Sequence, residues 1–201
     1  QPVGVTASVR IALFMVAGFA LVLLAAGEYS YPNLHTILDT AACLLTGMLA
    51  LLLWDVGRRT PLLVATLLSL CFGVAFVAEL LHVAVTVDWF GRLEWITRGR
   101  EDLRPATWPV ALYLLSGGTV VALGIRKLEA RGTTIFGVGL LIAGALLVWL
   151  FHELPRFTSP GFLGITRPTL IGVPLIWLVV AVVCWRRRAL DRLYPMLLTA
   201  S

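Results

Sequence analysis

Charge is what this chain has least of. Only 13% of its 201 residues are charged, whereas 59% are apolar and the mean hydropathy is +0.92. A soluble domain carries about 25% charged residues. A chain of this size cannot hide so large an apolar excess in water, because too little polar surface would remain to cover it. The composition therefore excludes an ordinary water-soluble globule and indicates that lipid surrounds much of the chain.

The chain also lacks the usual marks of a secreted scaffold, an enzyme or a nucleic-acid-binding protein. Its three cysteines, Cys43, Cys71 and Cys184, fall inside apolar runs, so they predict small buried side chains rather than a disulfide framework. No nucleophile–base pair is recognisable, and we expect no catalytic residues. The net charge of +5 comes from short basic clusters between apolar runs, which is not a nucleic-acid pattern.

Long apolar runs are what the chain does have. In lipid, only helices and closed β-barrels satisfy the hydrogen bonds of their own backbone. The runs here extend to about 20 residues without alternating apolar and polar residues, which favours helices over barrel strands. We therefore predict an all-α, polytopic membrane helix bundle with about six spans. The predicted spans are Val9–Ala26, Leu34–Trp54, Leu62–Val87, Trp108–Ile125, Thr133–Phe151 and Thr169–Trp185.

The distribution of basic residues predicts how the bundle is oriented. Ten of the 16 Lys and Arg residues fall on one side: Arg10, the links Asp55–Thr60 and Arg126–Arg131, and the stretch Trp185–Arg192. The longer links 88–105 and 152–167 carry the other six. Positive residues gather on the cytoplasmic side, so we expect both termini inside. We treat 1–193 as one transmembrane domain and 194–201 as the start of a cytoplasmic tail. The first residue, Gln1, suggests a fragment or a processed chain.

Four ionisable residues stand out inside the second and third predicted spans. His35 and Asp39 are one helical turn apart near the start of the second span, and Glu79 and His82 share a face near the end of the third. The two spans form a predicted antiparallel hairpin, so both pairs lie at the outer level. The third histidine, His152, also lies at an outer end. Because charge in hydrocarbon costs about 2.5–3.5 kcal/mol, these residues predict a polar outer pocket.

Several interpretations of this pocket remain open. His35, Glu79, His82 and His152 could bind a metal ion or haem. Alternatively, His35–Asp39 and His82–Glu79 form a hydrogen-bonded network that fixes helix packing or senses a small ligand, or the residues are unrelated and sit at the lipid interface. Outer-side residues complete the candidate ligand-binding set: Arg104, Trp108, Glu153, Arg156 and Arg167. Their arginines suit lipid phosphates or an anionic or quinone-like ligand.

Five motifs follow one another along roughly residues 34–176. They are His35-x-x-Leu-Asp39, Glu79-Leu-Leu-His82, Thr107-Trp108 with Tyr113–Ser116, Leu154-Pro155 and Gly164–Thr166. Their order resembles the bacterial membrane-associated sensor domains of the third class. Where the family tends to continue with a Phe-Lys pair and an acid in the last helix, this chain has Arg167-Pro-Thr169 and an apolar run.

The resemblance implies an N-terminal sensory input module in the bacterial inner membrane. Such modules precede histidine kinase, PAS or diguanylate cyclase domains in the same polypeptide, and such sensors usually work as homodimers. We expect a receptor that binds a ligand or a metal or haem cofactor at the outer pocket and signals inward through its last span. The alternatives are a metal- or haem-binding redox protein and an accessory subunit of a larger membrane complex. The expected partners are the lipid bilayer, such a signalling domain and a second copy of the chain, and we expect no nucleic acid.

Overall fold

The computed structural model describes residues 31–60, 62–153 and 168–187. Internal contacts divide the chain into two units, 1–40 and 41–201. The described part of the first unit is the beginning of one helix, and all tertiary contacts given below lie within the second. Side chains are described from Thr36 onward. The predicted first span, 9–26, and the predicted tail, 194–201, lie outside the described residues.

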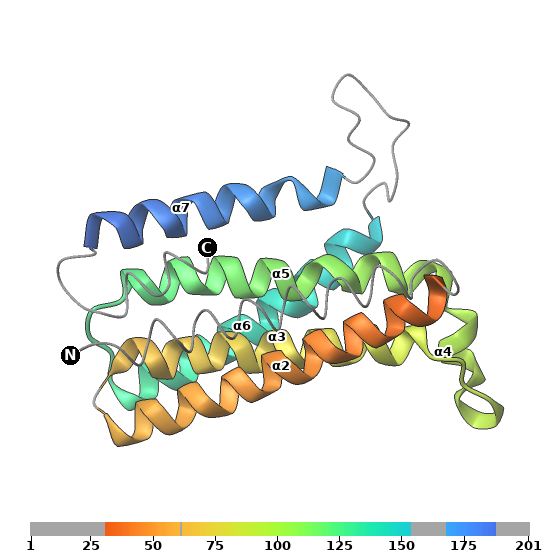
Figure 1. Ribbon diagram of the computed structural model, residues 1–201, viewed down its shortest axis with the longest axis horizontal. Helices are drawn as coiled ribbons and strands as arrows, with labels where there is room; N and C mark the ends of the chain where they lie inside the picture. Colours follow the sequence, from red (N-terminus) through yellow and green to blue (C-terminus); the bar gives the residue numbers. More distant parts are fainter. Residues whose placement is uncertain (1–30, 61, 154–167, 188–201) are drawn as a thin grey trace, which may run out of the picture. The chain divides into compact units, whose positions relative to one another are not determined.

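Helices and short links make up the whole of the described chain, and no strand occurs in it. Figure 1 shows the elements in chain order from red to blue. The long helices are α2 (Tyr31–Arg59), α3 (Leu63–Thr86), α5 (Arg100–Gly124), α6 (Ala130–Glu153) and α7 (Gly172–Arg187). The short ones are η1 (Gly91–Leu93), α4 (Glu94–Arg98) and η2 (Pro168–Leu170).

Four of these helices, α2, α3, α5 and α6, are long and apolar enough to cross a membrane. The sequence-based prediction of an all-helical, membrane-type chain is thereby confirmed for the described ranges. The helix α7 has 16 residues, which span about 24 Å at 1.5 Å per residue. A bilayer core is about 30 Å thick, so α7 would need its flanks to cross.

The predicted link 88–105 is wrong in its extent. The structure contains η1 and α4 within it, and α5 begins at Arg100 rather than at Trp108 and continues through Pro105 and Pro109. Proline usually marks a helix boundary. Each proline removes one backbone hydrogen bond, and its ring crowds the carbonyl four residues earlier. Burial of Ala106, Thr107 and Pro109 against neighbouring helices keeps the helix intact through this region.

Consecutive long helices run in opposite directions within residues 41–187. His82, late in α3, meets Thr107, early in α5, whereas Cys71 in α3 lies beside Gly118, late in α5. In the same way Leu114 of α5 packs at Gly144 of α6. The start of α7 contacts the middle of α5, and its end contacts the end of α5, so α7 is parallel to α5 and antiparallel to α6.

The alternation brings the basic clusters to one end of this unit. The last turn of α2 carries Arg58 and Arg59, and the last turn of α7 carries Arg186 and Arg187. The link between α5 and α6, 125–129, lies at the same end. The residues His82, Arg104 and His152 fall at the opposite end. The charge separation read from the sequence is therefore compatible with the directions of the helices.

The centre of the unit is α5, which contacts α3, α6 and α7. Of an apolar 18-residue stretch in α5, 61% is buried, compared with 33% in α3, 17% in α6 and 11% in α2. The main core cluster joins α3, α5 and α6 through Leu67, Leu68, Cys71, Ala106, Val110, Leu114, Ala122, Leu140 and Phe151. Of these four helices, α5 is thus the one most enclosed by protein.

Candidate functional site

The site begins with a hydrogen bond between two buried side chains on facing helices. Nδ1 of His82 in α3 lies 2.9 Å from Oγ1 of Thr107 in α5. Only 5% of His82 and 2% of Thr107 is exposed. Both helices are candidate membrane spans, so this bond links two apolar helices through polar groups near the end opposite the basic clusters.

The hydrogen-bond partners of Thr107 indicate which ring nitrogen of His82 carries the proton. The Thr107 hydroxyl donates to the backbone carbonyl of Leu103, 2.9 Å away, with the carbonyl of Arg104 at 3.3 Å. A hydroxyl has one proton to donate. Oγ1 therefore accepts a hydrogen bond from Nδ1–H of His82, and in the neutral ring the basic lone pair is on Nε2. Nε2 is shielded from solvent. It can accept a hydrogen bond or a proton, or bind a metal.

Glu79 adds a carboxylate one turn before His82 on α3. The residue is half-buried, and its Oε2 is shielded from solvent. The carboxylate lies close enough to the thiol of Cys43 in α2 to interact with it electrostatically. Cys43 is 3% exposed, and its Sγ lies 3.9 Å from the carbonyl oxygen of Phe76. Three helices therefore contribute polar atoms to this region: α2, α3 and α5.

The predicted outer residues Arg104 and Trp108 flank Thr107 on α5 and are half-buried. Arg104 is three residues before Thr107, so the two lie on neighbouring positions of one helix face. By contrast, His152 and Glu153 lie at the exposed end of α6, with side chains 47% and 63% exposed and Nδ1 3.5 Å from Oε1. The structure therefore places His152 and Glu153 on the surface rather than in the buried cluster.

The remaining predicted site residues belong to the first unit or lie outside the described residues. Asp39 belongs to the unit 1–40; it is half-buried, and its Oδ2 is shielded. The side chain of His35 and all of Arg156 and Arg167 lie outside the described residues. Among the residues that the structure describes, no group of three or more His, Cys, Asp or Glu is arranged to hold a metal ion. Because the predicted metal set includes His35, the metal or haem interpretation stays a prediction.

Sequence reasoning missed two residues of the cluster, Thr107 and Cys43. Thr107 was noted only as part of a helix-opening motif, although a hydroxyl between two prolines in an apolar helix is a signal for a polar contact. Cys43 was predicted to be a small buried residue. Its burial is confirmed, as is that of Cys71 and Cys184, and all three thiols are free. Its place one turn after Asp39 on α2 was the missed signal.

The helix α7 is attached to α5 at both ends. The Tyr113 hydroxyl of α5 donates to the carbonyl of Thr169, 2.8 Å away, and a Cβ at Gly172 would collide with the Tyr113 side chain. At the other end, the Arg187 guanidinium donates to the carbonyl of Leu123. Between these ends, Val180 and Cys184 pack with Leu123. A displacement of α5 would therefore be passed to α7.

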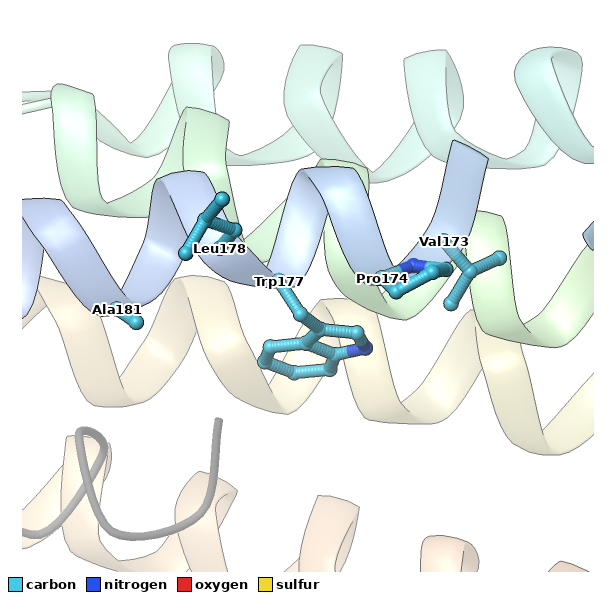
Figure 2. A pocket seen from close by; sticks show the side chains of 5 residues that line it. All are labelled: Val173, Pro174, Trp177, Leu178 and Ala181. Carbon is cyan, nitrogen blue, oxygen red and sulfur yellow. The ribbon is translucent and has the colours of Figure 1, made fainter. Parts of the chain in front are cut away.

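An open apolar groove runs along one side of α7. It is lined by Val173, Pro174, Trp177, Leu178 and Ala181, and Figure 2 shows these side chains along the helix. Trp177 also packs against the cluster of Leu123, Val180 and Cys184. The lining offers no charged group, so it provides packing surface rather than chemistry.

Comparisons with protein-family models, with curated proteins and with solved structures found no match to this chain.

Proposed function

We propose that the chain is the membrane-embedded input module of a bacterial signalling protein, of the kind that the third class of membrane-associated sensor domains represents. In this proposal six spans, including 9–26 and α7, cross the inner membrane with both termini in the cytoplasm. Four apolar helices of spanning length support it. So does the alternating direction of the long helices, which gathers the basic clusters at one end, as cytoplasmic ends require.

The proposed ligand site is the polar cluster of Cys43, Glu79, His82 and Thr107, with Arg104 and Trp108 beside it. The observation that carries the proposal is the buried bond between His82 and Thr107. Ionisable groups within membrane spans are costly and mark functional sites by default. The imidazole, the carboxylate and a nearby guanidinium suit a small polar ligand, such as the head of a quinone, better than they suit a purely apolar one.

The proposed signal travels through α5 to α7. A ligand shifts a conformational equilibrium only if it binds one conformation more tightly than the other. A ligand that bonds to His82 or Glu79 would do so by favouring one position of α3 relative to α5. Because α7 is tied to α5 at Tyr113 and Leu123, it follows α5. The last turn of α7 lies at the basic end, where a cytoplasmic kinase or cyclase domain of the same polypeptide would attach. Homodimerisation would bring two output domains together.

The test joins the chain to a diguanylate cyclase domain and measures its activity in nanodiscs during titration with decylubiquinone. We expect His82→Ala to abolish the response and Thr107→Val to weaken it about tenfold, the effect of losing one buried hydrogen bond. His152→Ala is the matched control, since this histidine lies at the same end but on the surface, and it should respond like the wild type.

Three results would contradict the proposal. A folded His82→Ala protein that responds like the wild type would remove the site from signalling. A haem absorption band or stoichiometric metal in the purified protein, lost on His82→Ala, would favour the redox alternative instead. Loss of response in His152→Ala alone would place the ligand on the surface of α6.

A further inference from the structure

The segment that joins α3 to α5, residues 87–99, holds large apolar side chains away from the protein. Phe90 is 86% exposed, Trp95 65% and Leu93 42%. Figure 1 shows this segment, with η1 and α4, where α3 ends and α5 begins. Single exposed apolar residues are ordinary on protein surfaces, but a cluster of them marks an interaction surface. Three within six residues form such a cluster.

The segment is internally bonded, so its exposed side chains are presented by a defined fold. The Trp89 indole Nε1 donates to the carbonyl of Ala84 in the last turns of α3, 2.6 Å away. The Trp89 backbone N–H donates to Oγ1 of Thr97 at 2.8 Å, and that hydroxyl donates back to the Trp89 carbonyl at 3.1 Å. An ion pair between Asp88 and Arg100 joins the two ends. Gly91 takes a positive φ of 65°, which favours glycine.

The charges of the segment leave one cation directed outward. Asp88 pairs with Arg100, and Glu94 pairs with Arg98 at 3.2 Å. Arg92 is exposed and forms no ion pair with the residues that the structure describes. It lies between Phe90 and Leu93 in the sequence. The exposed surface therefore combines apolar rings with a guanidinium, a group that binds phosphate oxygens well.

We propose that this segment, termed the interfacial loop (residues 87–99), binds the phospholipid surface of the leaflet at which α3 and α5 leave the bilayer. The position of the loop in the chain favours lipid over a protein partner, because both of its ends lead directly into candidate membrane spans. The Trp89–Ala84 bond also folds it back onto the end of α3, at the depth of the headgroups. Aromatic side chains partition to this depth, and Arg92 supplies charge for anionic headgroups. This inference does not depend on the proposed ligand site.

The experiment measures the depth of a nitroxide at Leu93→Cys in the full chain, reconstituted in phosphatidylcholine nanodiscs with and without phosphatidylglycerol. Because the three native cysteines are buried, the label reacts with the introduced thiol, and labelling of the unmodified chain gives the background. Collision rates with oxygen and with a water-soluble nickel chelate report depth. Glu129→Cys at the opposite end provides the water-exposed reference, and Leu146→Cys, exposed on α6, provides the lipid-facing one.

We expect the Leu93 label to meet oxygen several-fold more often, and the nickel chelate several-fold less often, than the Glu129 label. In the double variant Leu93→Cys/Arg92→Gln, the label should move toward water in the anionic nanodiscs. In phosphatidylcholine nanodiscs its depth should stay the same. A label as open to the nickel chelate as that at Glu129 would overturn the proposal and leave the surface available for a protein partner. A depth insensitive to Arg92→Gln in both lipids would overturn the assignment of phosphate binding to Arg92.

Discussion

The helices α5 and α6 are neighbours of nearly equal length, yet they face different surroundings. Of an apolar 18-residue stretch, 61% is buried in α5 and 17% in α6. The helix α5 buries small and hydroxyl-bearing residues: Ala106, Thr107, Ala111, Ser116, Gly118, Thr119 and Ala122. The helix α6 exposes large apolar ones: Ile135, Val138, Leu141, Ile142, Leu146, Trp149 and Leu150. The more enclosed helix is the less apolar one.

This difference is the one expected of a bundle in lipid rather than in water. Lipid chains are as apolar as leucine, so large apolar side chains gain little by turning inward, whereas small residues let helices approach closely. The serine and threonine hydroxyls in α5 remain acceptable because each donates to a carbonyl one turn earlier. Ser116 bonds to Leu112 at 2.8 Å and Thr119 to Leu115 at 2.6 Å. The comparison thus predicts that equal substitutions in α5 and α6 have unequal effects.

The largest difference is expected for leucine truncation. Leu114→Ala in α5 removes a side chain that is 2% exposed and should lower the free energy of unfolding by about 2–5 kcal/mol, the range for buried leucines. Leu146→Ala in α6 removes one that is 58% exposed and should cost less than about 1 kcal/mol, because lipid replaces the lost contacts. Steric trapping in bicelles measures both. Equal losses would mean that α6 is covered by protein in its native assembly.

A smaller difference is expected for glycine replacement. A Cβ at Gly118 in α5 would lie 2.7 Å from Sγ of Cys71 and 3.2 Å from Cδ2 of Leu140, so Gly118→Ala should destabilise the protein by about 1–3 kcal/mol through overpacking. Gly139→Ala in α6 meets nothing within 4 Å and should be neutral or stabilising, because alanine favours helix. Thermal unfolding in detergent compares the two variants.

A second substitution separates overpacking from other causes at Gly118. Cys71→Ala removes the sulfur and leaves Cβ of residue 71 at 3.4 Å from the added methyl, an ordinary contact distance. The double variant Gly118→Ala/Cys71→Ala should therefore recover most of the loss caused by Gly118→Ala. Additive losses in the two single variants would show that crowding against Cys71 is not the cause.

The helical fold was predictable to the extent that apolar run length decides it. Runs such as Leu34–Trp54 and Thr133–Phe151 lie within α2 and α6, because the bilayer thickness sets a helix length that the sequence displays directly. The start of α5 was not predictable in this way. Its first turns contain charges and prolines that are typical of a link, and they are helical because tertiary burial around Pro109 outweighs local preference.

The candidate site was predictable only in part. The ionisable pair Glu79 and His82 stood out, since charge is rare in apolar runs, and helix periodicity placed both on one face. The bond from His82 to Thr107 depends on which face α3 turns toward α5. That orientation cannot be read from a single sequence. The exposure of His152 was not predictable for a related reason: its level in the bundle follows from topology, but its exposure follows from which face of α6 packs on α5, as Phe151 does on Tyr113.

The smallest difference is expected for the removal of one hydroxyl group from each helix. Tyr113→Phe keeps the ring, whose centroid lies 5.4 Å from that of Phe151, and removes only the hydroxyl that donates to Thr169. We expect a loss of about 1 kcal/mol in the free energy of unfolding, the usual contribution of one hydrogen bond. Thr134→Val in α6 is the control, because its hydroxyl is exposed and bonds within its own helix at 3.3 Å.

The same pair of variants tests whether the Tyr113 hydroxyl attaches the start of α7 to α5. If the Tyr113 hydroxyl fixes the start of α7, hydrogen exchange at Val173 and its neighbours should speed up in Tyr113→Phe and stay unchanged in Thr134→Val. Local opening of this kind needs less free energy than global unfolding, so it is detectable even when the stability loss is small. Unchanged exchange in Tyr113→Phe would leave packing at Val180 and Cys184, together with Arg187, as the attachment of α7 to α5.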